Sequence, residues 1–233
     1  RSRVDNDPSS ILQEQMMAAL YANHPYGIPI IGWSHEIAAL DREDALGFYK
    51  RFYAPNNALL VIAGDVGPDE VRKLAEETFG KLPPHRSLND RSRPQEPEHY
   101  APVKVELEDA RAGRMTVQRY YLTPSYATAA PGEAEALDLL MRIAAAGSVS
   151  KLYKRLVIEQ TKAARAGGWY SDSGLDDGRG AFYAIGAEKV TPDELGKAMD
   201  DVVAELRETG VTQGELDRAR SAYLAEFVYT TDS

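Results

Sequence analysis

The apolar and polar positions near the start of the chain recur with a helical period. The apolar side chains within residues 9–22 include Ile11, Leu12, Met16, Met17, Ala19 and Leu20. This spacing places them close to one face of a helix. Asp7 can accept hydrogen bonds at the helix N-cap, and Pro8 fits the first helical position. The pattern predicts a helix here and a second helix that starts at Asp41 and closes before Pro55.

A continuous apolar run follows these two helices. Residues 57–65 contain the segment ALLVIAG, which is apolar at nearly every position, as is typical of a strand buried on both faces. Pro68 then stands at a first helical position, and Asp69 and Glu70 lie where the helix dipole favours acidic side chains. The pattern predicts a buried strand followed by a helix that Gly80 ends.

The chain changes character after this helix. Residues 82–102 (LPPHRSLNDRSRPQEPEHYAP) hold five prolines and almost no apolar side chains. Such a composition is typical of an extended linker that runs over a protein surface. We therefore expect one structural unit in residues 1–82, a linker in residues 83–102, and a second unit in residues 103–233.

The second half of the chain combines strands and helices. Residues 103–108 (VKVELE) and 115–122 (MTVQRYYL) alternate in polarity, which predicts strands with one solvated face. The segments ARAGGWYSDSG and RGAFYAIGAEK predict two more strands, joined by the turn GLDDG.

Four helices accompany these strands. They are expected over residues 131–147, from a cap at Ser148 or Ser150, over residues 192–207, and from Thr212 onward. Glu215 stands three residues after Thr212, and this spacing is that of a capping box.

Two segments of the chain resemble each other. LVIAGDVGPDEV and YAIGAEKVTPDEL both run from a strand through a short exit into Pro-Asp-Glu and a helix. Pro-Asp-Glu is a common helix start, so the motif alone does not establish a repeat. The order of the predicted elements favours a repeat, because each half of the chain contains a strand followed by a long helix. The predicted fold is α+β, with two similar units.

Composition and charge narrow the function classes. The 233 residues suffice for a substantial core, and the net charge is −9 with a pI near 5.0. Nucleic-acid binding depends on lysine and arginine neutralising phosphates, so the charge argues against a nucleic-acid partner. No apolar run approaches the length that spans a bilayer. The absence of cysteine excludes disulfides, thiolate metal sites and a cysteine nucleophile, and it leaves both the bacterial periplasm and the cytoplasm open.

The histidines do not form a metal motif. No two of His24, His35, His85 and His99 are four residues apart, so no helix can present a histidine pair to a metal. His85 and His99 fall in the linker and are expected to be solvated. His24, within NHPYG, is expected to be a turn histidine, with a cleft-lining role as the alternative. No G-x-S-x-G segment and no phosphate-cradling glycine loop is present.

The second half contains several aromatic residues in its predicted strands and helices. They include Tyr120, Tyr121, Tyr126, Tyr153, Trp169, Tyr170, Phe182 and Tyr183. Aromatic side chains in strands usually belong to a core, and a peptide-binding groove is the functional alternative. An extended peptide could add to a sheet edge here, and Trp169 and Tyr170 are the residues whose removal would test this hypothesis.

Two segments of the chain resemble a known protein family. The segments HPYGIPIIGW and FYAPNNALLVIAGDV resemble the insulinase/pitrilysin-type zinc metallopeptidases, which include the mitochondrial processing peptidases and their bacterial relatives. GSVSKLYKRLVIEQTKAA and LDRARSAYLAEFVYTTDS extend the resemblance over nearly the whole chain. The resemblance implies two similar α+β units joined by a linker, each with an antiparallel-rich sheet under helices. It also implies that two such halves, in one chain or two, close around an unfolded peptide.

The resemblance also implies zinc chemistry, and here the chain departs from the family. The family's His-x-x-Glu-His helix is absent, so the zinc ligands of the full-length protein are expected upstream of Arg1, and none in this chain. Family subunits without catalytic activity carry an arginine and a tyrosine where this chain has Val157 and Ala164, which favours the catalytic kind of subunit. A peptide or unfolded polypeptide substrate and a second homologous subunit, or a homodimer, are the expected partners.

The leading hypothesis is a large fragment of a zinc-dependent endopeptidase that is itself inactive and supplies the substrate-enclosing part. It comprises the end of a first α+β unit and most of a second, and it assigns no catalytic, metal or substrate-binding residue to the chain. A non-catalytic scaffold or substrate-presenting subunit of the same family is the second hypothesis, and an unrelated α+β binding module is the third.

Overall fold

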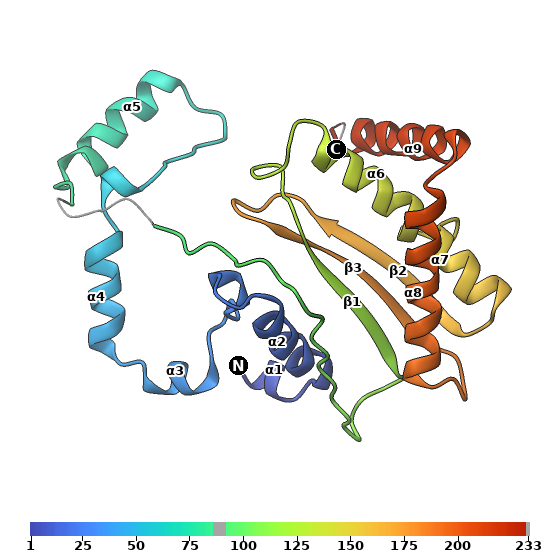
Figure 1. Ribbon diagram of the computed structural model, residues 1–233. Helices are drawn as coiled ribbons and strands as arrows, with labels where there is room; N and C mark the ends of the chain where they lie inside the picture. The colour runs from blue at the N-terminus through green and yellow to red at the C-terminus, as the bar shows by residue number, and fades with distance from the viewer. Residues whose placement is uncertain (86–91, 232–233) are drawn as a thin grey trace. The chain divides into compact units, whose positions relative to one another are not determined.

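The computed structural model describes residues 1–85 and 92–231, and these divide into two compact units (Figure 1). The first unit comprises Arg1–Asn6 and Ser10–Val105, and the second comprises Asp7–Ser9 and Glu106–Ser233. Part of the predicted linker, residues 86–91, lies outside the described residues. The fold class is α+β, as the sequence predicts, because helices accompany a small antiparallel sheet.

The first unit is helical in its described residues. Its elements are α1 (Ser2–Asp5), α2 (Pro8–Leu20), η1 (Pro25–Gly27), α3 (Ser34–Ala39), α4 (Arg42–Phe52), η2 (Pro55–Asn57), α5 (Pro68–Glu77) and η3 (Phe79–Lys81). The predicted start of α4 is confirmed by a capping box, in which the Asp41 carboxylate accepts from the Asp44 amide at 2.9 Å and the Asp44 carboxylate accepts from the Asp41 amide at 3.1 Å.

The strand predicted at residues 57–65 is not formed in the first unit. The backbone at Ala58 is extended, but residues 58–66 join no ladder, and Leu59 and Val61 are 89% and 77% exposed. A strand requires a neighbour for its amides and carbonyls, and the described residues of this unit supply none. The prediction for residues 103–108 fails in the same way, since that segment also joins no ladder.

The second unit contains a three-stranded antiparallel sheet. Strands β1 (Thr116–Thr123), β2 (Ala163–Ser171) and β3 (Gly178–Gly186) lie in the order β1-β3-β2. The hairpin of β2 and β3 predicted around GLDDG is therefore confirmed, and β3 is the central strand of the sheet. The helices are α6 (Glu133–Ala145), α7 (Lys151–Tyr153) with the π-helical turn η4 (Lys154–Glu159), α8 (Pro192–Thr209) and α9 (Gln213–Thr231).

Side-chain caps define where these helices begin. The Ser150 hydroxyl, one of the two predicted candidates, accepts from the Tyr153 amide at 3.3 Å and caps α7. Thr191 forms a capping box with Glu194 at the start of α8. The predicted pairing of Thr212 with Glu215 is confirmed, because the Glu215 carboxylate accepts from the Thr212 amide at 2.8 Å.

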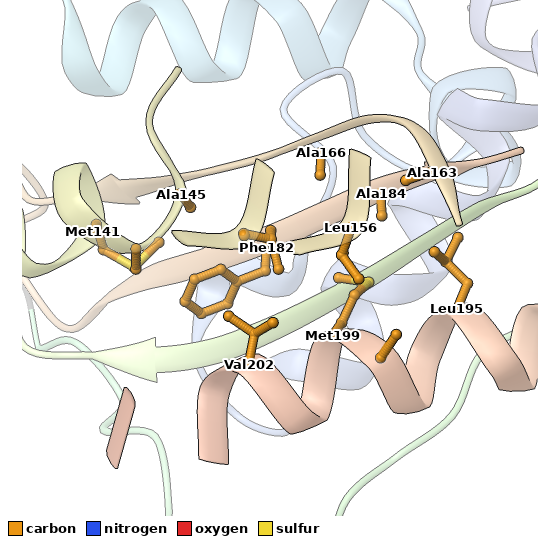
Figure 2. Packing of buried hydrophobic residues seen from close by; sticks show 13 residues of the cluster. Met141, Ala145, Leu156, Ala163, Ala166, Phe182, Ala184, Leu195, Met199 and Val202 are labelled. Atoms are coloured by element: carbon orange, nitrogen blue, oxygen red, sulfur yellow. The ribbon is translucent and has the colours of Figure 1, made fainter. Parts of the chain in front are cut away.

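The core of the second unit lies between one face of the sheet and helices α6, α7 and α8. On α8, Leu195, Met199 and Val202 recur at helical spacing and point toward the strands (Figure 2). These three side chains belong to the same hydrophobic cluster as Phe182 of β3 and Leu156 of η4. This packing leaves the opposite face of the sheet without core side chains from these helices.

Small residues let α6 approach the sheet closely. A Cβ atom at Gly168 of β2 would lie 2.6 Å from the Ala145 side chain and 2.5 Å from the Ala181 carbonyl oxygen. No real side chain tolerates such distances, so the close packing of α6 against β2 depends on this glycine.

Candidate functional site

The face of the sheet opposite the helices is the candidate functional surface. Successive strand residues point to opposite faces, so the antiparallel register assigns every position to one face. We call the surface opposite the core the open face. It consists of Thr116, Gln118, Tyr120 and Leu122 of β1, Arg165, Gly167, Trp169 and Ser171 of β2, and Arg179, Ala181, Tyr183 and Ile185 of β3.

Two aromatic rings meet at the middle of the open face. Ala181 of β3 lies directly opposite both Tyr120 of β1 and Trp169 of β2. Because alanine is short, the two rings reach across it and meet edge to face, with centroids 6.0 Å apart. Ala181 is buried beneath them, while Trp169 remains 37% exposed. The pair therefore offers an apolar contact surface to solvent.

A second aromatic side chain lies one row further along the strands. Tyr183 stands opposite Gly167, and a Cβ atom at Gly167 would lie 2.8 Å from the tyrosine hydroxyl. The tyrosine ring thus fills the space that a side chain at Gly167 would take. Aromatic side chains cover glycines across strands in this way and hold the register.

Two arginines belong to the open face. The Arg179 guanidinium lies over the Trp169 ring, with its central carbon 5.2 Å from the ring centroid. Arg165 is exposed and lies opposite Ile185, at the other end of the strands. Sequence reasoning did not single out either arginine. The two-residue period along β2 places Arg165 on the same face as Trp169, but only the register between β2 and β3 adds Arg179 to that face.

Tyr170 does not share this surface. It points to the helix side of β2, packs against the core cluster, and its hydroxyl donates to the Pro124 carbonyl oxygen. Burial raises the pKa of this phenol, with neighbouring carboxylates adding to the effect, so the hydroxyl stays a donor at neutral pH. Of the two residues named in the peptide-contact hypothesis, only Trp169 is presented on the open face, and the hypothesis itself stays a prediction.

On the other face of the sheet, ion pairs connect the covering helices to β1 and to one another. Arg119 of β1 donates from Nε to Asp200 of α8 at 2.8 Å, and this hydrogen bond raises the pKa of the guanidinium. Arg142 of α6 lies 2.6 Å from Glu226 of α9, and its guanidinium is 4.4 Å from the centre of the Tyr223 ring. These contacts tie the helices to one another and to β1.

The histidines occupy structural positions. His24 is buried and caps η1, because its Nδ1 accepts from the Tyr26 amide at 3.2 Å, so the prediction of a turn histidine is confirmed. His99 is not simply solvated as predicted, because its Nε2 lies 2.7 Å from the Glu96 carboxylate. His35 is exposed on α3.

Glu96 holds the loop around His24 in place. Its carboxylate accepts from the backbone amides of Ala22, Asn23 and His24 at 2.7, 3.0 and 2.9 Å. Burial opposes ionisation of this carboxylate, but its hydrogen bonds with His99 and the three amides outweigh burial and lower its pKa to about 2.

The part of the chain that the structure describes offers no set of ligands that fits a zinc ion. Among residues 1–85 and 92–231, no three His, Cys, Asp or Glu side chains are grouped so that they could hold a metal. The His24 ring accepts from the Tyr26 amide, and the His99 ring contacts the Glu96 carboxylate. We therefore assign no step of a reaction to a metal bound by this chain.

Two further positions come from the resemblance, which implies an arginine and a tyrosine in non-catalytic subunits where this chain has Val157 and Ala164. Val157 lies in η4 and packs against the core cluster. Ala164 lies in β2 and is partly buried. Neither side chain can donate a hydrogen bond to a peptide.

A family comparison covers most of the chain. Residues 39–223 match the protein family described as the peptidase M16 inactive domain. This match confirms the resemblance to insulinase-type peptidases drawn from the HPYG and PNNALLVIAGDV segments.

Individual relatives extend the comparison. The zinc protease PqqE of Helicobacter pylori is 26% identical over 235 residues, which cover 100% of this chain and 52% of that protein. The probable mitochondrial-processing peptidase subunit beta of Schizosaccharomyces pombe is 25% identical over 251 residues, which cover 100% of this chain and 52% of that protein. The chain thus spans about half the length of these curated relatives.

A solved structure shares the fold. The crystal structure of a protease from Helicobacter pylori superposes with a TM-score of 0.81 at 24% identity, over 98% of this chain and 54% of that one. Within the described residues, no helix is both long and apolar enough to cross a membrane.

Proposed function

Because the chain belongs to the peptidase M16 inactive-domain family, we propose that it is the non-catalytic, polypeptide-enclosing part of a zinc-dependent endopeptidase. The observation that carries the proposal is the family match over residues 39–223. The names of the relatives support a peptidase, since PqqE is called a zinc protease. The zinc ligands of the full-length enzyme would lie outside this chain, in the part upstream of Arg1.

The open face supports an enclosing role. It presents Trp169, Tyr120 and Tyr183 on a rigid sheet, with Trp169 partly exposed. Exposed aromatic rings on a regular sheet contact extended polypeptide without requiring one sequence, because every peptide has apolar and backbone groups. We therefore assign polypeptide contact to the second unit.

The domain organisation belongs to the same proposal. Residues 1–82 form the C-terminal part of a first α+β unit, residues 83–102 the linker, and residues 103–233 a second, similar unit. The exposed apolar run at residues 58–66 supports this, because its composition suits a strand covered on both faces. A second homologous subunit, or a homodimer, would complete the enclosure.

Peptidase assays on the longest natural form of the protein test the proposal. An unstructured fluorogenic peptide is incubated with that form, with and without a chelator, and in parallel with residues 1–233 alone. We expect chelator-sensitive cleavage by the longer form and none by residues 1–233.

Other outcomes separate the alternatives. Cleavage by residues 1–233 alone would contradict the proposal. Absence of cleavage by either form, with or without a homologous partner subunit added, would favour the second hypothesis of a scaffold or substrate-presenting subunit. Val157 and Ala164 argue against a scaffold subunit, because the resemblance implies an arginine and a tyrosine at these positions in non-catalytic subunits.

A further inference from the structure

The open face carries basic and no acidic side chains at its strand positions, although the protein as a whole is acidic. The chain has 36 acidic and 27 basic residues, with a net charge of −9. The positions of the open face include Arg165 and Arg179 and no aspartate or glutamate. A positive surface on an acidic protein attracts negative ligands and repels positive ones.

The two arginines differ from the partly buried arginines elsewhere in the second unit. Arg119, Arg142 and Arg155 each have a carboxylate partner, in Asp200, Glu226 and Glu205 respectively. Within the described residues, neither Arg165 nor Arg179 makes an ion pair with a carboxylate. Their charge is therefore available to a ligand.

Arg179 is also held in a defined orientation. Its guanidinium lies over the Trp169 ring, and its Nε is buried and has no hydrogen-bond acceptor in the part of the chain that the structure describes. An oriented guanidinium loses less freedom when it binds a carboxylate than a free side chain does.

The spacing of the arginines suits an extended chain. Arg165 lies opposite Ile185, and Ile185 follows Arg179 by six positions along β3. Six residues of a strand span about 20 Å. Trp169, Tyr120 and Tyr183 occupy the rows between the two arginine positions, and the Arg179 guanidinium reaches over the Trp169 ring. Acidic positions in a bound segment would therefore flank an apolar middle.

We infer that the open face binds an extended, acidic polypeptide segment, in which carboxylates at the two ends pair with Arg179 and Arg165 and apolar side chains pack on Trp169 and Tyr120. The inference rests on the proposed function and names the substrate class that the enclosing part prefers. Charge-assisted hydrogen bonds from guanidinium to carboxylate supply the preference, and the aromatic rings supply sequence-tolerant contact.

Binding of three matched peptides to residues 1–233 tests the inference. Each probe is a fluorescein-labelled ten-residue peptide with the same apolar middle, and each carries two Glu, two Gln or two Lys residues six positions apart. Fluorescence anisotropy at low salt is expected to show that the Glu peptide binds about fivefold or more tightly than the Gln peptide, and the Lys peptide most weakly. The preference should shrink as salt is added, because screening weakens exposed charge pairs.

Substitutions locate the effect on the open face. Arg179→Gln and Arg165→Gln should each reduce the preference for the Glu peptide over the Gln peptide, and Trp169→Leu should weaken all peptides. Arg207→Gln is the matched control, since Arg207 is an exposed arginine in the last turn of α8. Circular dichroism melting of each variant verifies that it folds.

Several results would overturn the inference. Equal affinity for the Glu and Gln peptides would remove the acidic preference while leaving peptide contact, and thus the proposed function, intact. An equal loss with Arg207→Gln would show a nonspecific charge effect. A dimer that dissociates on Trp169→Leu would assign the face to a second copy of the chain. If none of the peptides binds, the inference is wrong, and the cleavage assay above still decides the proposed function by itself.

Discussion

At the scale of single residues, one carboxylate organises a loop of the first unit. Glu96 accepts from three consecutive backbone amides and from His99, and its side chain is 6% exposed. The loop has the sequence NHPYG, in which Pro25 and Gly27 form η1. Sequence reasoning placed Glu96 in a solvated linker, so this role depends on a contact more than seventy residues away along the chain.

Glu96→Gln tests this role. The amide nitrogen of glutamine cannot accept from a backbone amide, so hydrogen exchange at Ala22, Asn23 and His24 should accelerate by about tenfold, which corresponds to a loss of about 1–2 kcal/mol. Hydrogen exchange measured by NMR checks this. Glu98→Gln is the control, since Glu98 accepts from the Tyr100 hydroxyl and not from the loop. Unchanged protection in Glu96→Gln would contradict the role.

The same carboxylate predicts a pH dependence. Its pKa in the folded chain is about 2 and its ordinary value is 4.5. The stability it contributes is therefore fully present above pH 4.5 and is lost as the pH falls from 4.5 toward 2. Unfolding of the wild type should become easier over that interval, and Glu96→Gln should flatten the dependence. Parallel curves for the two proteins would rule this out.

Neighbouring residues of β2 should respond differently to substitution. Tyr170→Phe removes the hydrogen bond to the Pro124 carbonyl and should lower the free energy of unfolding by about 1 kcal/mol without changing peptide affinity. Trp169→Leu should weaken peptide binding and change stability less. Denaturant unfolding and anisotropy on the two variants check both expectations, and the reverse pattern would show that the faces are assigned wrongly.

At the scale of elements, the start of α8 depends on its cap. The Thr191 hydroxyl accepts from the Glu194 amide at 3.3 Å, and the Glu194 carboxylate accepts from the Thr191 amide at 2.9 Å. Because α8 contributes Leu195, Met199 and Val202 to the core, Thr191→Ala should lower the free energy of unfolding by about 1 kcal/mol. Thr191→Ser keeps the cap oxygen and should retain most of the stability. Equal losses in both variants would attribute the effect to the methyl group.

The contact between α6 and β2 depends on Gly168. Gly168→Ala places a Cβ atom 2.5 Å from the Ala181 carbonyl oxygen, so the backbones must separate, and we expect a loss of roughly 2 kcal/mol or more. Gly113→Ala is the matched control, because nothing lies within 4 Å of its Cβ position. Thermal melting followed by circular dichroism measures both. Similar melting temperatures would mean that the strand tolerates a side chain there.

At the scale of the whole molecule, the two units differ in how well they bury their apolar residues. In the second unit, Leu152, Leu156, Leu195 and Met199 are fully buried. In the first unit, residues 58–63 are apolar and exposed and join no ladder. A continuous apolar run with free backbone groups is unfavourable in water, so a protein covers it or pairs it.

The proposed domain organisation predicts where that cover comes from. If residues 58–66 form a strand of a sheet completed by polypeptide outside residues 1–82, their amides should exchange slowly in the longest natural form of the protein. In residues 1–233 alone they should exchange fast. Hydrogen exchange by mass spectrometry compares the two forms, and fast exchange in both would contradict the assignment.

The sequence by itself determined most of the longer helices, several of their caps, the α+β class and the family, because these depend on local and repeating signals. Asp41, Ser150, Thr212 and Pro192 mark helix starts through contacts within a few residues. The hairpin of β2 and β3 likewise followed from its turn, and the family followed from segments such as HPYG and PNNALLVIAGDV.

Only the tertiary structure decided which residues act together. A strand forms only where a neighbour supplies its hydrogen bonds, which is why residues 115–122 became β1 and residues 57–65 did not become a strand. The register of three strands, set by pairing over long separations in sequence, brought Tyr120, Trp169 and Arg179 onto one face and turned Tyr170 to the other. The candidate surface therefore arises from the alignment of distant segments, which no local pattern encodes.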